Sequence, residues 1–138
     1  MDAKVTWKQD GMMFKATADT GGAIDLASKL DSGASGFRPM ELLAMGLAGC
    51  TGMDVISILK KKRMDVVDFE VRVHTEKSET YPQIWTKARI EYIVTGRNID
   101  PKAVERAMEL SRDTYCPAQN MLAKAVNFEL KYKIVEVE

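Results

Sequence analysis

The stretch RPMELLAMGLAGCTGMDVISILKKKR, residues 38–63, decides the architecture of this chain. Its proline suits the first turn of a helix, and its four closing cations stand where the negative end of a helix dipole favours positive charge. Between the proline and these cations the only charged side chains are Glu41 and Asp54. The stretch therefore predicts one long helix, and its nearly apolar circumference predicts a helix that is buried on all sides.

The same stretch is long enough to suggest a membrane span. An acidic side chain near the middle of a spanning helix is costly, however, and Asp54 lies there. Residues 1–7 also lack the charged and then apolar pattern of a leader. We therefore expect no membrane contact and a cytoplasmic location.

Alternating apolar and polar residues on both sides of the long helix predict strands. Upstream, the pattern predicts a hairpin at 3–7 and 12–18 with a turn at 9–11, a third strand at 23–26 and a polar loop at 31–36. Downstream, it predicts an antiparallel strand pair at 67–73 and 88–94 and a half-buried strand at 126–134. Between them, proline and capping signals predict a helix from Asp100-Pro101 to about Ser111 and a shorter helix after Cys116-Pro117. Strands in batches, rather than in strict alternation with helices, favour an α+β fold over a parallel doubly wound one. We expect the strands to form an antiparallel sheet.

Length and composition narrow the class of protein. The 138 residues fit a single domain over residues 1–138. Twenty basic side chains offset twenty acidic ones, so the net charge is zero and the positive patch of a nucleic-acid binder is not expected. With 46% hydrophobic and 29% charged residues, the composition is typical of a folded globular protein and excludes a disordered chain.

The chain contains two cysteines, and their surroundings differ. Cys50 lies in the long helix on the same sector as Gly46 and Gly49, so a second backbone or a substrate can approach its sulfur closely. The glycines are equally compatible with tight helix packing around a cysteine that acts only as a small buried hydrophobe. Cys116 precedes Pro117 at an expected helix start, where the helix dipole favours a reactive thiolate with a lowered pKa.

A thiolate at Cys50 would need a cation beside it, because apolar surroundings in the middle of a helix disfavour the charge. The only nearby cation N-terminal to it is Arg38, which lies roughly 18 Å away along a straight helix that rises about 1.5 Å per residue. Arg38 therefore cannot touch the cysteine of its own helix if that helix is regular. The cation would come from a folded-back loop or from a second subunit.

Residues 38–51, which contain Gly-x-x-x-Cys, together with Tyr115-Cys116-Pro117 and the order of the elements, resemble the OsmC/Ohr family of thiol-dependent peroxidases, in a divergent OsmC-like branch. The resemblance implies an intertwined α+β homodimer with two active sites at the subunit interface. It also implies reduction of organic hydroperoxides, with Cys50 as the peroxidatic and Cys116 as the resolving cysteine. A dithiol such as a lipoyl-bearing protein would then reduce the oxidised pair, without a metal or an organic cofactor.

The charged partners of the peroxidatic cysteine depart from the family pattern. Family members typically carry an acid ten residues before that cysteine; here the place is taken by Met40, and the acid is displaced by one position to Glu41. The arginine of the Ohr branch lies in the N-terminal hairpin region, where this chain offers only lysines. We expect Arg38 to substitute for it and to stabilise the Cys50 thiolate, with Glu41 holding the guanidinium in place.

The substrate pocket is expected among apolar and small residues near Cys50, where an alkyl chain could be buried. These residues are Leu42, Met45, Gly46, Leu47, Gly49 and Met53. The main alternative is a non-enzymatic dimer that binds a small hydrophobic ligand in the same cleft, with the cysteines as packing residues. A metal site formed by the two cysteines and His74 is disfavoured, because no close Cys/His pair exists and His74 continues the polar face of a strand.

Overall fold

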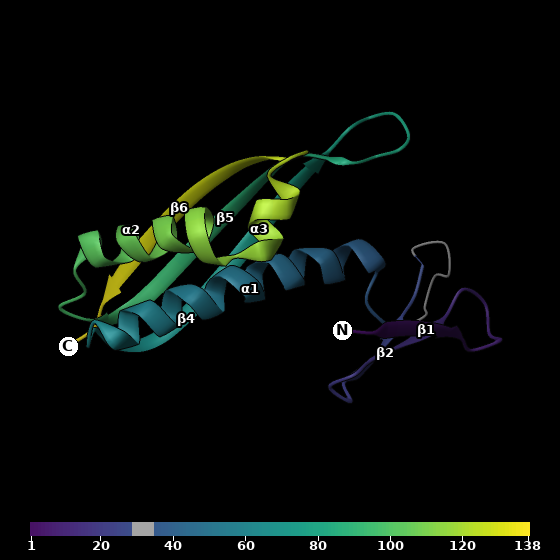
Figure 1. Ribbon diagram of the computed structural model, residues 1–138, viewed down its shortest axis with the longest axis horizontal. Helices are drawn as coiled ribbons and strands as arrows, with labels where there is room; N and C mark the ends of the chain where they lie inside the picture. The colour runs from purple at the N-terminus through teal and green to yellow at the C-terminus, as the bar shows by residue number, and fades with distance from the viewer. Residues whose placement is uncertain (29–34) are drawn as a thin grey trace. The chain divides into compact units, whose positions relative to one another are not determined.

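The computed structural model describes residues 1–28 and 35–138, which divide into two compact units, 1–44 and 45–138. The elements in chain order are β1 (Ala3–Trp7), β2 (Phe14–Ala18), β3 (Ala23–Leu26), α1 (Pro39–Lys61), β4 (Asp65–Lys77), β5 (Trp85–Arg97), α2 (Pro101–Leu110), the π-helical turn η1 (Ser111–Tyr115), α3 (Pro117–Leu122) and β6 (Asn127–Glu136) (Figure 1). This content confirms the predicted α+β class. The single domain over residues 1–138 stays a prediction, and residues 31–34 of the predicted polar loop lie outside the described residues.

The first unit contains a three-stranded antiparallel sheet in the order β1-β2-β3. The hairpin pairs Trp7 with Phe14, and its turn is closed by the Lys8 backbone N–H, which donates to the Met13 carbonyl at 3.0 Å. Gly11 adopts a φ of 52° in this turn, a conformation that glycine reaches without a Cβ clash. The predicted hairpin and third strand are therefore confirmed.

The second unit contains a three-stranded mixed sheet in the order β4-β5-β6. Strands β4 and β5 form the predicted antiparallel pair, whereas β6 runs parallel to β5, with Ile90 opposite Leu130 and Val94 opposite Ile134. The prediction of a wholly antiparallel sheet is thus wrong for the last strand. The physical reason is the crossover through α2, η1 and α3, which returns the chain to the same end of the sheet at which β5 began.

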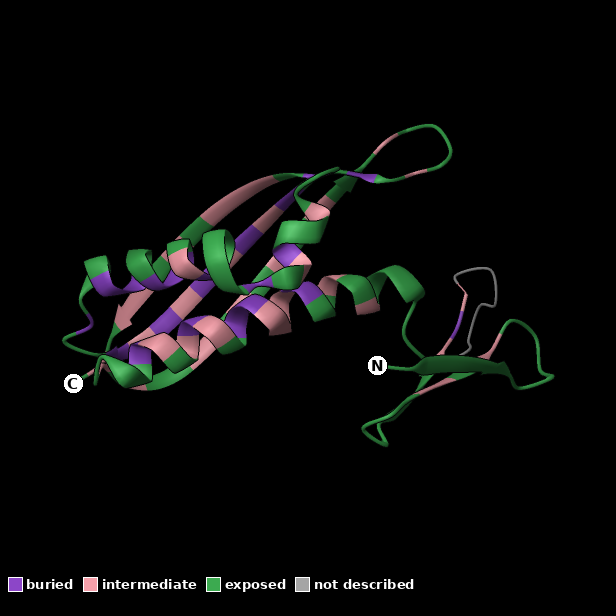
Figure 2. Cartoon of the chain, viewed as in Figure 1, coloured by how far each residue is buried: buried purple, intermediate pink, exposed green. Residues whose placement is uncertain are grey.

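The core of the second unit lies between this sheet and the helices. Every second residue of β5 from Ala88 to Val94 is fully buried, and these side chains face α1 and α2, which cover one face of the sheet (Figures 1 and 2). The buried residues that the two helices contribute are Leu47, Thr51, Gly52, Val55 and Leu59 from α1 and Ala103, Val104, Ala107 and Met108 from α2. Helix α2 begins as predicted, with the Asp100 carboxylate accepting a hydrogen bond from the Lys102 backbone N–H at 3.0 Å.

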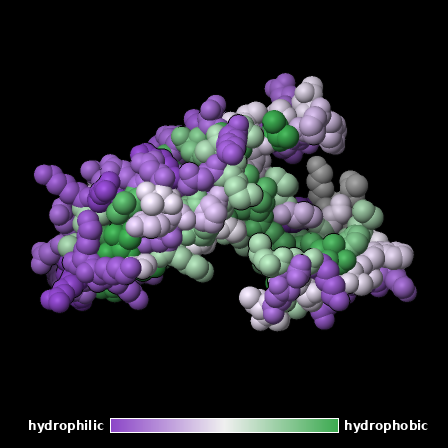
Figure 3. Space-filling view, in the orientation of Figure 1, coloured by the Kyte–Doolittle hydropathy of each residue, from purple (hydrophilic) through white to green (hydrophobic). Residues whose placement is uncertain are grey.

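Helix α1 is buried along one stripe only, so the prediction of burial on all sides is wrong for a single chain. Met45 is 43% exposed and Met53 is 74% exposed, and apolar atoms reach the surface of both units (Figure 3). The second unit offers this helix one layer to pack against, which covers only the side that faces the sheet. The helix has the length and composition of a membrane span, a property it shares with many core helices of globular proteins.

The glycines of α1 face two different environments. A Cβ on Gly52 would lie 3.1 Å from Val71 Cγ2, so the missing side chain lets α1 approach β4 closely. A Cβ on Gly46 or Gly49 would meet nothing within 4 Å among the described residues. The exposed side of α1 around these two glycines is therefore open to a close approach from outside the chain.

Candidate active site

The two cysteines meet inside the second unit. Cys50 is half-buried on α1, and Cys116 is fully buried at the junction between η1 and α3. The Cys50 side chain is hydrogen-bonded to the Cys116 thiol. Two thiols that are far apart in the sequence are thus in direct contact, as a disulfide-forming pair requires.

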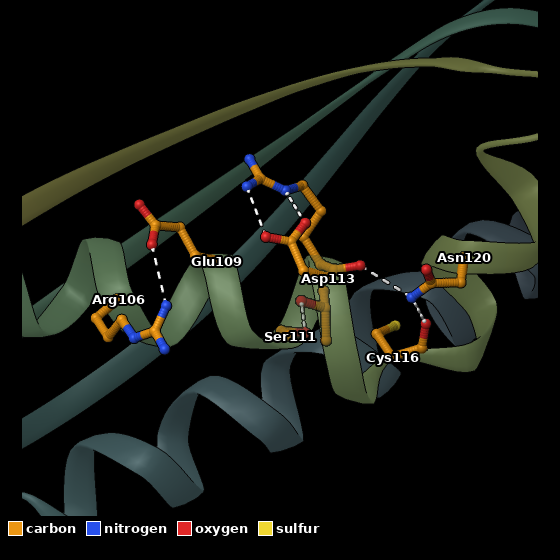
Figure 4. Close-up of polar contacts among 8 residues, drawn as sticks. Arg106, Glu109, Ser111, Asp113, Cys116 and Asn120 are labelled. Atoms are coloured by element: carbon orange, nitrogen blue, oxygen red, sulfur yellow. Dashed lines mark hydrogen bonds and ion pairs between the residues drawn. The ribbon is translucent and has the colours of Figure 1, made fainter.

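The backbone around Cys116 fixes the position of its sulfur. The π-helical turn η1 delivers the residue, and the Cys116 backbone N–H closes this turn by donating to the Ser111 carbonyl at 2.8 Å. Ser111, the first residue of this turn, and Cys116, which follows it, are drawn in Figure 4. The Gln119 backbone N–H donates to Cys116 Sγ at 3.3 Å, so the thiol acts as the N-cap of α3. The Asn120 amide donates to the Cys116 carbonyl at 2.7 Å. Turns of this kind are often found at functional sites.

Burial decides the acidity of Cys116. Desolvation raises the pKa of this thiol to about 11, and the neighbouring Cys50 and Asp54 add to the rise, while the hydrogen bond from Gln119 opposes it. The prediction of an activated thiolate with a lowered pKa is therefore wrong. Helix α3 has only six residues, and the single N–H bond that it donates to the sulfur contributes less than burying the charge costs.

A chain of buried hydroxyls lies beside the two thiols. Thr51 Oγ1 lies 2.7 Å from both Tyr92 Oη and Ser111 Oγ, and Ser111 Oγ donates to Asp54 Oδ2 at 2.9 Å. Burial raises the pKa of Tyr92 to about 12, so its hydroxyl remains a donor. Sequence reasoning missed this cluster. Its one visible signal was Asp54, a lone acid in the apolar middle of the long helix.

Arg38 and Glu41, the predicted charged partners, belong to the first unit. Glu41 Oε1 accepts a hydrogen bond from the Arg38 backbone N–H at 2.8 Å, which is half of a capping box at the start of α1. No ion pair joins the two side chains in the described part of the chain, so the expectation that Glu41 holds the guanidinium is not met there. The carboxylate instead satisfies a free backbone donor at the helix start.

The predicted pocket residues divide between the core and the surface. Leu47 is buried in the core of the second unit, where it cannot line an open cleft, whereas Leu42 and Gly49 are half-buried and Met45, Gly46 and Met53 are exposed. His74 is exposed on β4, as predicted for the polar face of that strand.

Two cavities are lined by residues outside α1. One, of about 450 Å³, lies along the sheet of the first unit and is lined by residues of β1, β2 and β3. The other, of about 260 Å³, is lined by Gln119 and Asn120 of α3 and by residues of η1 and the start of β6. The Gln119 amide is 1% exposed and its nitrogen and oxygen have no hydrogen-bond partner within the described ranges. No sequence signal pointed to this side chain.

The raised pKa of Cys116 predicts a loss of stability at high pH. The folded protein keeps the thiol protonated up to about pH 11, whereas an unfolded thiol ionises near its ordinary value of 9.0. Between these values unfolding releases a proton, so the free energy of unfolding falls as the pH rises. Urea unfolding across this range is expected to show that fall, and Cys116→Ala should make the curve flatter. An unchanged slope in Cys116→Ala would contradict the assigned pKa.

The chain is similar to proteins of one family over nearly its whole length. Residues 32–131 match the sequence model of the family described as OsmC-like protein. Protein YhfA of Escherichia coli strain K12 is 40% identical over 135 residues, which cover 98% of each chain. A crystal structure of a hypothetical protein from Aquifex aeolicus VF5 superposes with a TM-score of 0.87 at 28% identity, covering 99% of this chain and 97% of that one. The organic hydroperoxide resistance protein OhrB of Bacillus subtilis has the same fold, with a TM-score of 0.64 at 22% identity over 96% of this chain and 98% of that one.

Proposed function

Because the chain belongs to the OsmC-like protein family, we propose that it reduces organic hydroperoxides, with Cys50 as the sulfur that attacks the peroxide and Cys116 as the sulfur that resolves the product. The family includes proteins named for organic hydroperoxide resistance, which supports a redox-related role at the level of the family. The specific reaction and its residues are our proposal.

The observation that carries the proposal is the contact between the two thiols. Cys50 is the more accessible of the two, and Cys116 is buried behind it and hydrogen-bonded to it. A peroxide that enters from the exposed side of α1 therefore meets Cys50 first. Because the two thiols interact directly, Cys116 is placed to condense with an oxidised Cys50.

The reaction balances with two thiols and one peroxide. The Cys50 thiolate attacks one oxygen of the O–O bond; the bond breaks, Cys50 becomes a sulfenic acid, and the other oxygen leaves as an alkoxide that takes up a proton to form the alcohol. The Cys116 sulfur then displaces hydroxide from the sulfenic acid, and its proton leaves with that hydroxide as water. A dithiol, of the lipoyl type, reduces the disulfide and is itself oxidised to a cyclic disulfide.

The protein would act as an intertwined homodimer in which Arg38 of a second chain supplies the cation at Cys50. Three observations support this arrangement. First, the exposed side of α1 is apolar and lacks side chains at Gly46 and Gly49. Second, the Arg38 guanidinium makes no ion pair in the described ranges of its own chain. Third, twelve residues of straight helix would separate Arg38 from the Cys50 of the same chain by roughly 18 Å. A partner helix that packs on this side would complete the site.

The same apolar side favours an alkyl hydroperoxide over hydrogen peroxide. Met45 and Met53 are exposed there, and Leu42 is half-buried. A second chain would turn this open side into a cleft in which the alkyl group of the substrate loses its contact with water. Leu47 is excluded from this cleft because it points into the core.

One equivalent of an alkyl hydroperoxide is expected to consume both thiols of the reduced protein and to leave a disulfide between Cys50 and Cys116. Free thiols are counted with a chromogenic disulfide reagent after denaturation, and the bridged peptide is identified by mass spectrometry. Hydrogen peroxide at the same concentration serves as the comparison and should react more slowly. Survival of both thiols in excess hydroperoxide would overturn the proposal and favour a non-enzymatic protein that binds a hydrophobic ligand.

A further inference from the structure

The cavity of about 260 Å³ beside α3 contains a buried amide without a partner. It is lined by residues of η1, of α3 and of the chain that leads from α3 into β6, and Gln119 is among them. Gln119 is 1% exposed, and neither its side-chain nitrogen nor its oxygen finds a hydrogen-bond partner in residues 1–28 and 35–138. Buried polar groups of folded proteins are nearly always paired, so a partner from outside the chain is expected here. The space is several times what one water molecule needs.

The backbone of α3 fixes the place of Gln119, while its amide is held by no hydrogen bond. The Gln119 backbone N–H donates to Cys116 Sγ at 3.3 Å, which holds the residue against the buried thiol. The side-chain amide makes no such bond in the described part of the chain, so turning it toward the cavity breaks none. Gln119 can therefore offer both N–H donors and a carbonyl acceptor to a molecule in the cavity.

The neighbouring Asn120 adds an acceptor to this wall. Its Nδ2 atom donates to the carbonyl of Arg112 at 2.9 Å and to that of Cys116 at 2.7 Å, which uses both amide protons (Figure 4). What Asn120 offers the cavity is then its Oδ1 atom, which can only accept. Together the two side chains present one NH₂ group and two carbonyl oxygens.

The described lining of this cavity carries no uncompensated charge. Arg112 is the charged residue of the lining, and its Nε and Nη2 atoms donate to the Asp113 carboxylate at 2.6 and 3.0 Å. The wall also includes the apolar side chains of Ala123, Val126 and Phe128. A neutral molecule with an apolar body therefore suits the cavity better than an ion.

We propose that this cavity binds a small neutral molecule that carries a primary carboxamide. The carbonyl oxygen of the ligand accepts from Gln119 Nε2, one of its N–H groups donates to Gln119 Oε1, and the other donates to Asn120 Oδ1. A carboxylate fails because it cannot donate, and a trans secondary amide fails because its N–H and C=O groups point in opposite directions. The cavity, of about 260 Å³, lies just below the range of about 300 to 1,000 Å³ that is typical of pockets for drug-sized ligands, so the molecule is small.

This site differs from the one proposed for the hydroperoxide. The described residues that line the cavity include none from α1, the helix that carries Cys50. Binding of a carboxamide also needs no reaction of either thiol. The inference therefore goes beyond the proposed function and does not depend on it.

Benzamide and benzoate are matched probes for this site. They share one shape and an apolar ring, but benzamide is neutral and can donate, whereas benzoate at neutral pH is an anion that can only accept. Each probe is titrated into the reduced full-length protein at neutral pH. Calorimetry gives the affinity, and NMR of the isotope-labelled protein gives the location. We expect benzamide to shift the side-chain amide resonances of Gln119 and to bind at least about tenfold more tightly than benzoate.

A variant of Gln119 tests the recognising group itself. Gln119→Met removes the amide but keeps an unbranched side chain of similar length. It should weaken benzamide binding by at least about tenfold and should fold normally, because it leaves no buried polar group unpaired. Gln83→Met is the matched control, since Gln83 is a half-buried glutamine between β4 and β5 that does not line the cavity. That variant should bind benzamide as the wild type does, and circular dichroism monitors the fold of both.

The outcomes of these tests are separable from those of the proposed function. Absence of benzamide binding at millimolar concentrations overturns the carboxamide site and leaves water as the occupant of the cavity. Equal affinity for benzamide and benzoate overturns it as well, and so does equal binding of benzamide by Gln119→Met and Gln83→Met, because the Gln119 amide is then not the recognising group. If benzamide binding is lost only in Gln119→Met while the wild-type thiols survive hydroperoxide, the carboxamide site stands and the peroxidase proposal fails.

Discussion

Replacing Cys50 with serine is expected to abolish hydroperoxide turnover, with an initial rate at least about a thousandfold below that of the wild-type protein. The reason is chemical, since a serine hydroxyl is un-ionised at neutral pH and attacks the O–O bond far more slowly than a thiolate. Cys116 cannot take over the first step, because burial raises its pKa to about 11 and leaves it protonated at neutral pH. The rate is measured as loss of an alkyl hydroperoxide in the presence of dihydrolipoamide.

The matched variant for this prediction is Cys116→Ser. It is expected to consume a single equivalent of hydroperoxide and then to stop, because the Cys50 sulfenic acid has no neighbouring sulfur to condense with. A sulfenic-acid trap such as dimedone should label Cys50 in this variant and should label little of the wild-type protein. Turnover in Cys50→Ser that is comparable to that of the wild type would refute the assignment of the two sulfurs.

Replacing Met53 with lysine is expected to convert the proposed homodimer to monomers and to remove most of its turnover. Met53 is 74% exposed on the apolar side of α1, near the glycines that leave room for a partner. A lysine buried there without a counter-charge costs roughly 3 kcal/mol or more, which is more than about a hundredfold in the dissociation constant of the dimer. Turnover would fall with assembly, because Arg38 of the partner could no longer reach Cys50. Light scattering gives the assembly state of each variant.

Met121→Lys provides the matched control for assembly. Met121 is 72% exposed on α3, so this variant makes the same chemical change at a similarly exposed methionine of the second unit. It should leave both the assembly state and the turnover close to those of the wild type. A monomeric wild-type protein at micromolar concentration, or a Met53→Lys variant that stays dimeric and active, would contradict the shared active site.

Most of the local structure followed from the sequence. The helices and strands were predicted from the two hydrophobic periodicities, from the proline at the start of α1 and from the Asp100 cap of α2. These signals act between residues that are close in the chain. The direction of β6 did not follow, because a strand has the same alternation whether it pairs in parallel or antiparallel. That direction depends on the crossover that precedes it.

The candidate site also combines features that the sequence predicted with features that only the folded structure shows. The sequence identified both cysteines, but it assigned the lowered pKa to Cys116, because a helix start is visible in the chain and the depth of burial is not. The hydroxyls of Thr51, Tyr92 and Ser111 come from three separate elements, and each hydroxyl looks unremarkable where it stands in the sequence. Only packing brings them to Asp54.

The sequence by itself thus determined the α+β class, the long central helix and the pair of sulfur atoms available for chemistry. The tertiary structure decided that Cys50 and Cys116 touch, that Cys116 stays protonated, and that one side of α1 is left uncovered in a single chain. The physical reason is that hydrophobic periodicity and capping are local properties of the backbone. The protonation of a thiol and the exposure of a helix face depend instead on what distant parts of the chain bring beside them.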